Sequence, residues 1–230
     1  MKSLKVLFSV FAFSFVCQFA FAQTFSLGGK VGLAYSGISS PGGISLADQY
    51  IKSYGGWDAG IVTNIGFKNG FSIQPELSYV EKGFKIDEGW NVPILGIDVP
   101  LGTKVITKLR YIEMPILAKY SFGNDKIKGY VLAGPTLGYA ASAAAKTYAS
   151  FIINFALNEI SIPLSSIGGQ RFEMGGMAGI GTSIAAGKST IFLDVRYAQG
   201  FTDINKVPLI DLNIKNHRFG VNAGFLIPLN

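Results

Sequence analysis

The sequence contains one cysteine and one histidine among its 230 residues. A disulfide needs two cysteines, and a zinc site built from cysteine and histidine needs three or four ligands, so neither can form within one chain. Charged residues are also scarce, at 15% of the chain against about 25% in typical soluble proteins. Together with a mean hydropathy of +0.35, this composition argues against a disordered chain and against an ordinary cytosolic surface.

The positive charges are spread along the chain. The formal net charge is +6, yet no run of five or more basic residues occurs. A dispersed charge of this kind does not indicate a nucleic-acid partner.

The N-terminal segment has the pattern of a secretory signal peptide. Two lysines, Lys2 and Lys5, precede an apolar stretch from Val6 to Val16, and Ala20-Phe21-Ala22 forms a small-x-small cleavage site. The apolar run is shorter than the roughly 20 residues of a membrane-spanning helix. We therefore expect residues 1–22 to be removed, and residues 23–230 to form one exported domain without cysteine.

Alternation with a period of two dominates the mature chain. Between Phe71 and Lys82, for example, the odd positions are mostly apolar and the even positions mostly polar, as in a strand with two different faces. Eight such segments lie at about 24–36, 55–68, 71–84, 105–122, 127–141, 171–187, 190–201 and 217–229. Bacterial single-chain outer-membrane barrels contain an even number of antiparallel strands.

The connections between these segments alternate in length. Asn69-Gly70, residues 123–126 and Lys188-Ser189 mark three tight turns, of which Asn-Gly is a type I′ hairpin signal. The other connections are longer, roughly 15 to 30 residues, and fall at the opposite end of an up-and-down barrel. The sequence predicts an all-β, eight-stranded antiparallel transmembrane barrel with short periplasmic turns and long external loops, closed because unpaired strand edges are costly in lipid.

Strand parity assigns the charged side chains to the lumen. Because eight strands enclose a space about as wide as side chains, we expect a network of paired charges there and no catalytic, cofactor-binding or metal site. In particular, we interpret Glu76 as structural and not as a general acid or base. The inward set is Lys30, Asp58, Glu76, Lys82, Glu173, Asp194, Arg196 and Arg218, joined by Glu113 and Lys119 if the register allows.

The one histidine, His217, is expected at the external rim, with Asp203 and Asp211 in the preceding loop. A general-base role is conceivable on residue type alone, but no nucleophile is marked. We expect an ordinary rim residue.

Two features leave alternatives open. Residues 143–160 are predicted to form either a loop over the barrel mouth or a short helix. Pro75, Pro115 and Pro135 fall within strands, which predicts either bulges there or a register that is off by one. Aromatic residues near strand ends are expected to form interfacial belts: Phe67, Phe71, Tyr120, Phe122, Tyr139, Phe201 and Phe225.

Several short strings resemble the PorT-like outer-membrane β-barrel family of the Bacteroidetes. They are Gly29-Lys30-Val31-Gly32-Leu33, Pro75-Glu76-Leu77-Ser78-Tyr79 with Lys82-Gly83, Tyr111-Ile112-Glu113-Met114-Pro115 with Lys119-Tyr120, Gly134-Pro135 with Gly138, and Asp194-Val195-Arg196-Tyr197 with Gly200 and Asp203. The resemblance covers essentially all of the mature chain. It implies an eight-stranded outer-membrane barrel and a link to protein secretion.

We therefore expect a non-enzymatic protein of the cell outer membrane. Its partners are the lipid bilayer and, through the external loops, other envelope proteins. The alternatives are a secreted or periplasmic lipocalin-like carrier of a small apolar ligand, and a small pore. The distribution of charge distinguishes a membrane barrel from a soluble carrier. The outer face of a soluble barrel must be polar because it contacts water, whereas the apolar faces of these strands are almost free of charge.

Overall fold

The computed structural model describes residues 24–39, 51–94, 97–151, 153–162, 171–202 and 215–229. These residues form an all-β structure with one short 3-10 turn, η1 (Lys68–Gly70). The strands are β1 (Thr24–Ser39), β2 (Ile51–Gly66), β3 (Phe71–Ile94), β4 (Ile97–Gly123), β5 (Ile127–Phe151), β6 (Ile153–Ile162), β7 (Phe172–Ala186), β8 (Ser189–Gly200) and β9 (Lys215–Pro228). The predicted fold class is confirmed, and no helix in the described part of the chain is long and apolar enough to cross a membrane.

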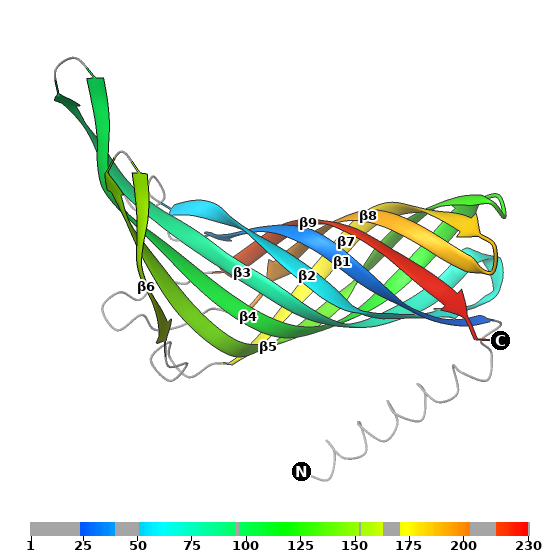
Figure 1. Ribbon diagram of the computed structural model, residues 1–230. Coiled ribbons are helices and arrows are strands. Elements are labelled where there is room, and N and C mark those ends of the chain that lie inside the picture. Colours follow the sequence, from blue (N-terminus) through cyan, green and yellow to red (C-terminus); the bar gives the residue numbers. More distant parts are fainter. Residues whose placement is uncertain are drawn as a thin grey trace, which may run out of the picture.

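Eight of the strands close into a barrel (Figure 1). Each pairs antiparallel with its neighbours. The first and last strands, β1 and β9, close the ring, and β5 is followed in the barrel by β7. The ninth strand, β6, pairs with the outer half of β5 and lies beyond the barrel wall. The predicted eight-stranded barrel is therefore confirmed, with one additional strand outside it.

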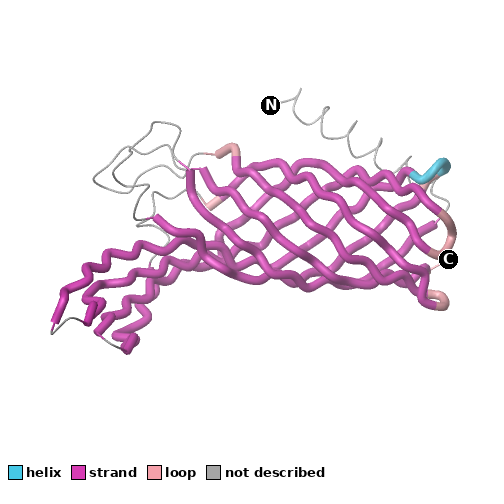
Figure 2. Tube along the Cα trace, turned by 90° about the horizontal axis from the view of Figure 1, so that it is seen from above, coloured by secondary structure: helices cyan, strands magenta, loops and turns pink. Residues whose placement is uncertain are grey.

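The tight turns gather at one end of the barrel (Figure 2). Asn69 and Gly70 both have positive φ, at 62° and 79°, as the predicted type I′ turn requires. The two described ends of the chain meet at the same end, where the Leu229 amide donates a hydrogen bond to the Phe25 carbonyl at 2.8 Å. By the rule for outer-membrane barrels, this short-turn end is the periplasmic one.

At the opposite end, two hairpins continue past the barrel (Figure 1). The connection between β3 and β4 is an extended hairpin paired up to Ile94 and Ile97, where the sequence predicts a loop. Residues 143–151 and 153–162 are strands, so both alternatives for residues 143–160, loop and helix, are wrong. The alanine-rich segment is strand because the extended β4 pairs with it from Ser142 to Phe151, and sheet pairing overrides local helix preference.

The three strand prolines interrupt pairing without shifting the register. In each case two pairs are missing towards the preceding strand, the register is the same on both sides of the gap, and pairing with the following strand is kept. Proline lacks the N–H that would complete the ladder on that side. Both predicted alternatives, a bulge at the proline and a register error, are therefore wrong. The retained partners of Pro75, Pro115 and Pro135 are Ile116, Thr136 and Gly176 respectively.

The outer wall of the barrel is apolar. Large side chains such as Val31, Ile61, Leu77, Ile180 and Leu193 are half or more exposed. Among the residues whose side chains are described, the exposed charges lie at strand ends or turns: Lys52, Lys68, Asp125, Lys126, Lys128, Arg171 and Lys188. A soluble carrier needs the reverse arrangement, because its exterior contacts water, so the carrier alternative does not fit this barrel.

Aromatic side chains flank the apolar wall. Near the short turns, the ring of Tyr120 lies 4.8 Å from that of Phe71 and 6.4 Å from that of Phe122. Towards the hairpin end, Trp57 contacts Tyr79 at 5.4 Å, and a second pair joins β5 and β7. Two such belts mark the interfaces of a membrane-spanning barrel. Of the seven predicted belt residues, five are exposed, while Phe67 and Tyr139 are half-buried.

Candidate functional site

The barrel lumen brings together all ten charged residues that parity assigned to it. They come from seven strands, β1 to β4 and β7 to β9. Nine of them are less than 9% exposed and Glu173 is half-buried. The inward placement of Glu113 and Lys119, which depended on register, is confirmed.

At the centre of the lumen, Arg196 pairs with the carboxylates of Glu76 and Asp194. We call these three side chains the Arg196 cluster. Nη1 of Arg196 donates to both carboxylate oxygens of Glu76 at 2.9 and 2.8 Å, and its Nε and Nη2 donate to Asp194 at 2.7 and 2.8 Å. Lys30 Nζ lies 3.1 Å from Glu76 and 3.6 Å from Asp58. Planar guanidinium groups suit this bidentate geometry, which fixes position as well as energy.

Neutral side chains complete the hydrogen bonding of Asp194. Its oxygens accept from the amide of Asn222 and from the hydroxyl of Tyr130, both at 2.9 Å. Space for the tyrosine ring comes from Gly181 on β7, where a Cβ atom would stand 2.5 Å from the ring carbon Cζ of Tyr130. This close approach requires glycine.

A second cluster lies towards the hairpin end. Glu113 pairs with Lys82 and with Arg218, the latter at 2.8 Å. Lys82 also contacts Glu173 at 3.0 Å, and its ammonium group lies 4.5 Å from the ring centre of Tyr111. Asp58 connects the two clusters, since Lys30 and Arg218 lie 3.6 and 3.7 Å from its oxygens.

The network carries no net charge. Lys30, Lys82, Lys119, Arg196 and Arg218 are balanced by Asp58, Glu76, Glu113, Glu173 and Asp194. Buried charges are tolerated when paired, and removing one partner typically costs about 3–5 kcal/mol. This ten-residue set, here called the lumen network, therefore fills the barrel with interlocked side chains.

The geometry gives no support to the catalytic interpretations. Both oxygens of Glu76 accept from Arg196, and Gln74 and Lys30 also contact this carboxylate, so it is held in ion pairs and hydrogen bonds within the lumen. His217 packs against Gly37 of β1, where a Cβ would stand 2.8 Å from its Nε2, while Asp203 and Asp211 lie outside the described residues. Within the described ranges no group of three or more histidine, cysteine, aspartate or glutamate side chains is placed to hold a metal ion.

Sequence reasoning missed the neutral members of the lumen. Gln74, Tyr130 and Asn222 all bond to lumen charges. The same parity that assigned the charges would have found them. Parity assigns Glu81 to the wrong face. The alternation places this residue on the apolar face, but its side chain is buried, accepts a hydrogen bond from Tyr54 and lies 3.6 Å from Arg110. A bulge in β2 between Ser53 and Asp58 changes the local pairing there.

Solved structures of similar architecture come from bacterial outer membranes. Neisserial surface protein A (NspA) is 14% identical, with 87% of this chain and 96% of that chain covered and a TM-score of 0.39. Ail of Yersinia pestis, solved with the heparin analogue sucrose octasulfate, is 13% identical (88% and 99% covered, TM-score 0.38). OprG of Pseudomonas aeruginosa is 12% identical (91% and 97% covered, TM-score 0.46).

No curated protein matches the sequence. The model of the family described as "Outer membrane protein beta-barrel domain" matches residues 21–206, most of the chain. This match agrees with the closed barrel, its apolar outer wall and its charged lumen. The chain is therefore a member of the outer-membrane β-barrel domain family and a protein of the outer membrane.

Proposed function

We propose that this protein is a non-conducting, non-enzymatic scaffold that holds two hairpins at the cell surface for interaction with other envelope proteins. The observation that carries the proposal is the combination of a filled lumen with strands that continue beyond the barrel. A rigid barrel that presents projecting segments is the usual way in which recognition is placed on a stable framework.

The filled lumen supports the non-conducting part. The lumen network crosses the barrel from β1 and β3 to β8, where Lys30, Glu76 and Arg196 lie in direct contact. Eight strands leave an interior about as wide as side chains, whereas water-filled porins use 16 to 18 strands. A permanent pore would require several ion pairs to separate at once.

The continuous strand pairing of the two hairpins supports the proposed role in interaction with other envelope proteins. β3 and β4 pair without interruption from Ser78–Glu113 to Ile94–Ile97, and β5 and β6 extend the same sheet from Ala143–Ile162 to Phe151–Ile153. A hydrogen-bonded extension loses less conformational entropy on binding than a flexible loop of equal length. Resemblance to PorT-like proteins makes the secretion machinery the first set of partners to test.

A conductance measurement tests the first part. The purified protein, refolded and inserted in planar bilayers, should give no stable, reproducible channels. The matched comparison is Arg196→Ala, which removes the arginine of the Arg196 cluster. This variant should have a higher conductance if the lumen network is the barrier to ions. Steady channels from the intact protein would support the small-pore alternative instead.

Hairpin truncation tests the second part. Deleting residues 147–158 and joining Lys146 to Glu159, which are paired in β5 and β6, with an Asn-Gly turn should keep the barrel and remove the tip. An insertion of a short tag between Gly187 and Lys188, at the short-turn end, is the control. Partners cross-linked in intact cells should be lost from the truncated variant and kept by the control. Unchanged partners would remove this hairpin from the interaction.

A further inference from the structure

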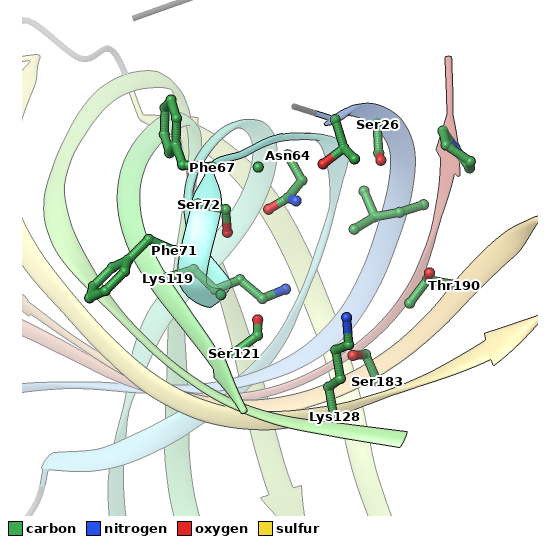
Figure 3. A pocket seen from close by; sticks show the side chains of 15 residues that line it. Ser26, Asn64, Phe67, Phe71, Ser72, Lys119, Ser121, Lys128, Ser183 and Thr190 are labelled. Atoms are coloured by element: carbon green, nitrogen blue, oxygen red, sulfur yellow. The ribbon is translucent and has the colours of Figure 1, made fainter. Parts of the chain in front are cut away.

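The short-turn end of the barrel contains a second polar site, which shares Lys119 with the lumen network. All eight barrel strands contribute to a cavity of about 300 Å³ that opens at this end (Figure 3). Hydroxyl groups ring its wall: Thr24, Ser26, Ser72, Ser121, Ser183 and Thr190. We call this cavity the vestibule.

Two lysines are the charged residues that line the vestibule, and none of its described lining residues is acidic. Figure 3 shows the side chains of Lys119 and Lys128 extending towards the same space from β4 and β5. Lys119 is only 6% exposed. Its ammonium group donates one hydrogen bond, to Gln74 Oε1 at 3.1 Å, and lies 3.8 Å from the ring centre of Tyr130. An ammonium group has three N–H donors, so Lys119 has donors to spare.

The other members of the lumen network close the inner side of the vestibule. Gln74 accepts from Lys119 and donates to Glu76 at 2.7 Å, so it lies between the lysine and the Arg196 cluster. Among the described residues, no carboxylate forms an ion pair with Lys119 within 4 Å. The vestibule is therefore closed on its inner side and has a buried cation in its wall, which suits binding and not passage.

The surroundings of the opening are basic as well. Described residues 24–28, 64–73, 118–129, 182–191 and 225–229 contain five lysines and one acidic residue, Asp125. Lys68, Lys126 and Lys188 are exposed on the three tight turns. Like charges gathered at one end raise the local concentration of anions.

An unsatisfied group lies in the same wall. Asn64 Oδ1 is buried with no hydrogen-bond partner, and its residue lines the vestibule. Unpaired buried polar atoms are costly, and they indicate a place where water or a ligand completes the bonding. A 180° rotation of this amide would present N–H donors instead.

We propose that the vestibule binds a phosphate group. Tetrahedral phosphate has oxygens that accept from donors on all sides, as a ring of hydroxyls with two lysines provides, and lysine binds phosphate as a point charge. The group has two sources at this level of the outer membrane, a free periplasmic phosphate and the head group of an anionic phospholipid next to the Phe71–Tyr120–Phe122 belt. The site does not depend on the proposed hairpin function.

Binding by the refolded full-length mature protein tests the proposal. Inorganic phosphate is titrated in a zwitterionic detergent by calorimetry, and native mass spectrometry counts phosphatidylglycerol retained from nanodiscs with and without that lipid. Lys119→Met removes the charge and keeps an unbranched side chain of similar length. It should weaken binding about tenfold, the size expected for one lost charge-assisted contact.

Lys188→Met is the matched control, because it removes the same charge from the same end without touching the vestibule. It should change the dissociation constant less than twofold. Lys128→Met, an exposed position, provides a second test if Lys119→Met fails to fold on a heat-shift gel. Saturable phosphate binding sensitive to these variants identifies a free anion as the source, and lipid retention with the same sensitivity identifies a head group. Absence of both, or binding insensitive to Lys119 and Lys128, would overturn the proposal.

Discussion

Glu76 and Arg196 are separated by 120 positions in the chain, yet they form the central contact of the lumen, with Nη1 of the arginine 2.8 and 2.9 Å from the two carboxylate oxygens. β3 and β8 are not neighbours in the sheet. The pair therefore connects strands that have no backbone hydrogen bonds with each other, and it ties the wall together across the interior.

Removing the arginine should strongly destabilise the barrel. Arg196→Met leaves Glu76 and Asp194 buried with fewer partners, and the expected loss is about 3–5 kcal/mol in the free energy of unfolding. Urea titration in lipid vesicles, followed by tryptophan fluorescence, measures this value. Lys188→Met, at an exposed turn, is the control and should stay within about 0.5 kcal/mol of the unmodified protein. A comparable loss of unfolding free energy in both variants would contradict the structural role of the Arg196 cluster.

The contact between Glu76 and Arg196 should also show coupling. In a double-mutant cycle with Glu76→Gln and Arg196→Gln, the double variant should be more stable than the sum of the single losses predicts, because neither charge is then left facing a missing partner. Coupling of about 1–3 kcal/mol is expected for directly bonded groups. Additive losses would mean that the two side chains act independently.

Gly181 should not tolerate even alanine. A Cβ atom at this position would stand 2.5 Å from the ring of Tyr130 and 2.7 Å from Cβ of Asp194. Gly181→Ala should therefore displace the tyrosine from Asp194 and cost about 1–3 kcal/mol, as overpacking does in protein cores. Gly55→Ala is the matched control, since nothing lies within 4 Å of its Cβ position. The readout is the same urea titration, and equal stability of the two variants would contradict the packing argument.

The barrel was predictable from the sequence because its signals are local. Period-two alternation sets which face meets lipid, so the inward positions of Lys30 and Asp194 follow from parity alone. Asn69-Gly70 likewise specifies its own turn through positive φ. The charge on the inner face and its near absence from the outer face distinguish a membrane barrel from a carrier.

Features that depend on distant partners were not predictable. Residues 143–151 are strand because β4 extends beside them, although their alanine content favours helix. The partner choice within the lumen network depends on how strands at opposite sides of the barrel face each other, which no local pattern records. The vestibule is likewise assembled from one or two residues on each of eight strands, and its polar members look like ordinary polar strand ends.

A charge on the outer wall should be costly in proportion to its depth. Leu77 and Leu193 are 52% and 51% exposed on the lipid-facing side. Leu77→Arg and Leu193→Arg should each lose about 2–4 kcal/mol, the penalty for arginine near the middle of the bilayer. Leu77→Phe and Leu193→Phe keep the face apolar and should be mild. If the phenylalanine variants proved as damaging as the arginine variants, steric packing and not lipid contact would govern these positions.

The proposed signal peptide gives a prediction about the mature protein. Cleavage after Ala22 should remove Lys2 and Lys5, so that the outer-membrane form begins at Gln23 and carries a net charge lower by two. Intact mass and N-terminal sequencing of protein from the outer-membrane fraction measure this directly. Ala20→Leu and Ala22→Leu enlarge the small residues that the cleavage site requires, so the precursor should accumulate with unchanged residues 23–230. A conservative Ala22→Ser variant should be processed normally. Recovery of the unmodified chain with Met1 still attached, folded in the outer membrane, would contradict the assignment of residues 1–22 to a cleaved segment.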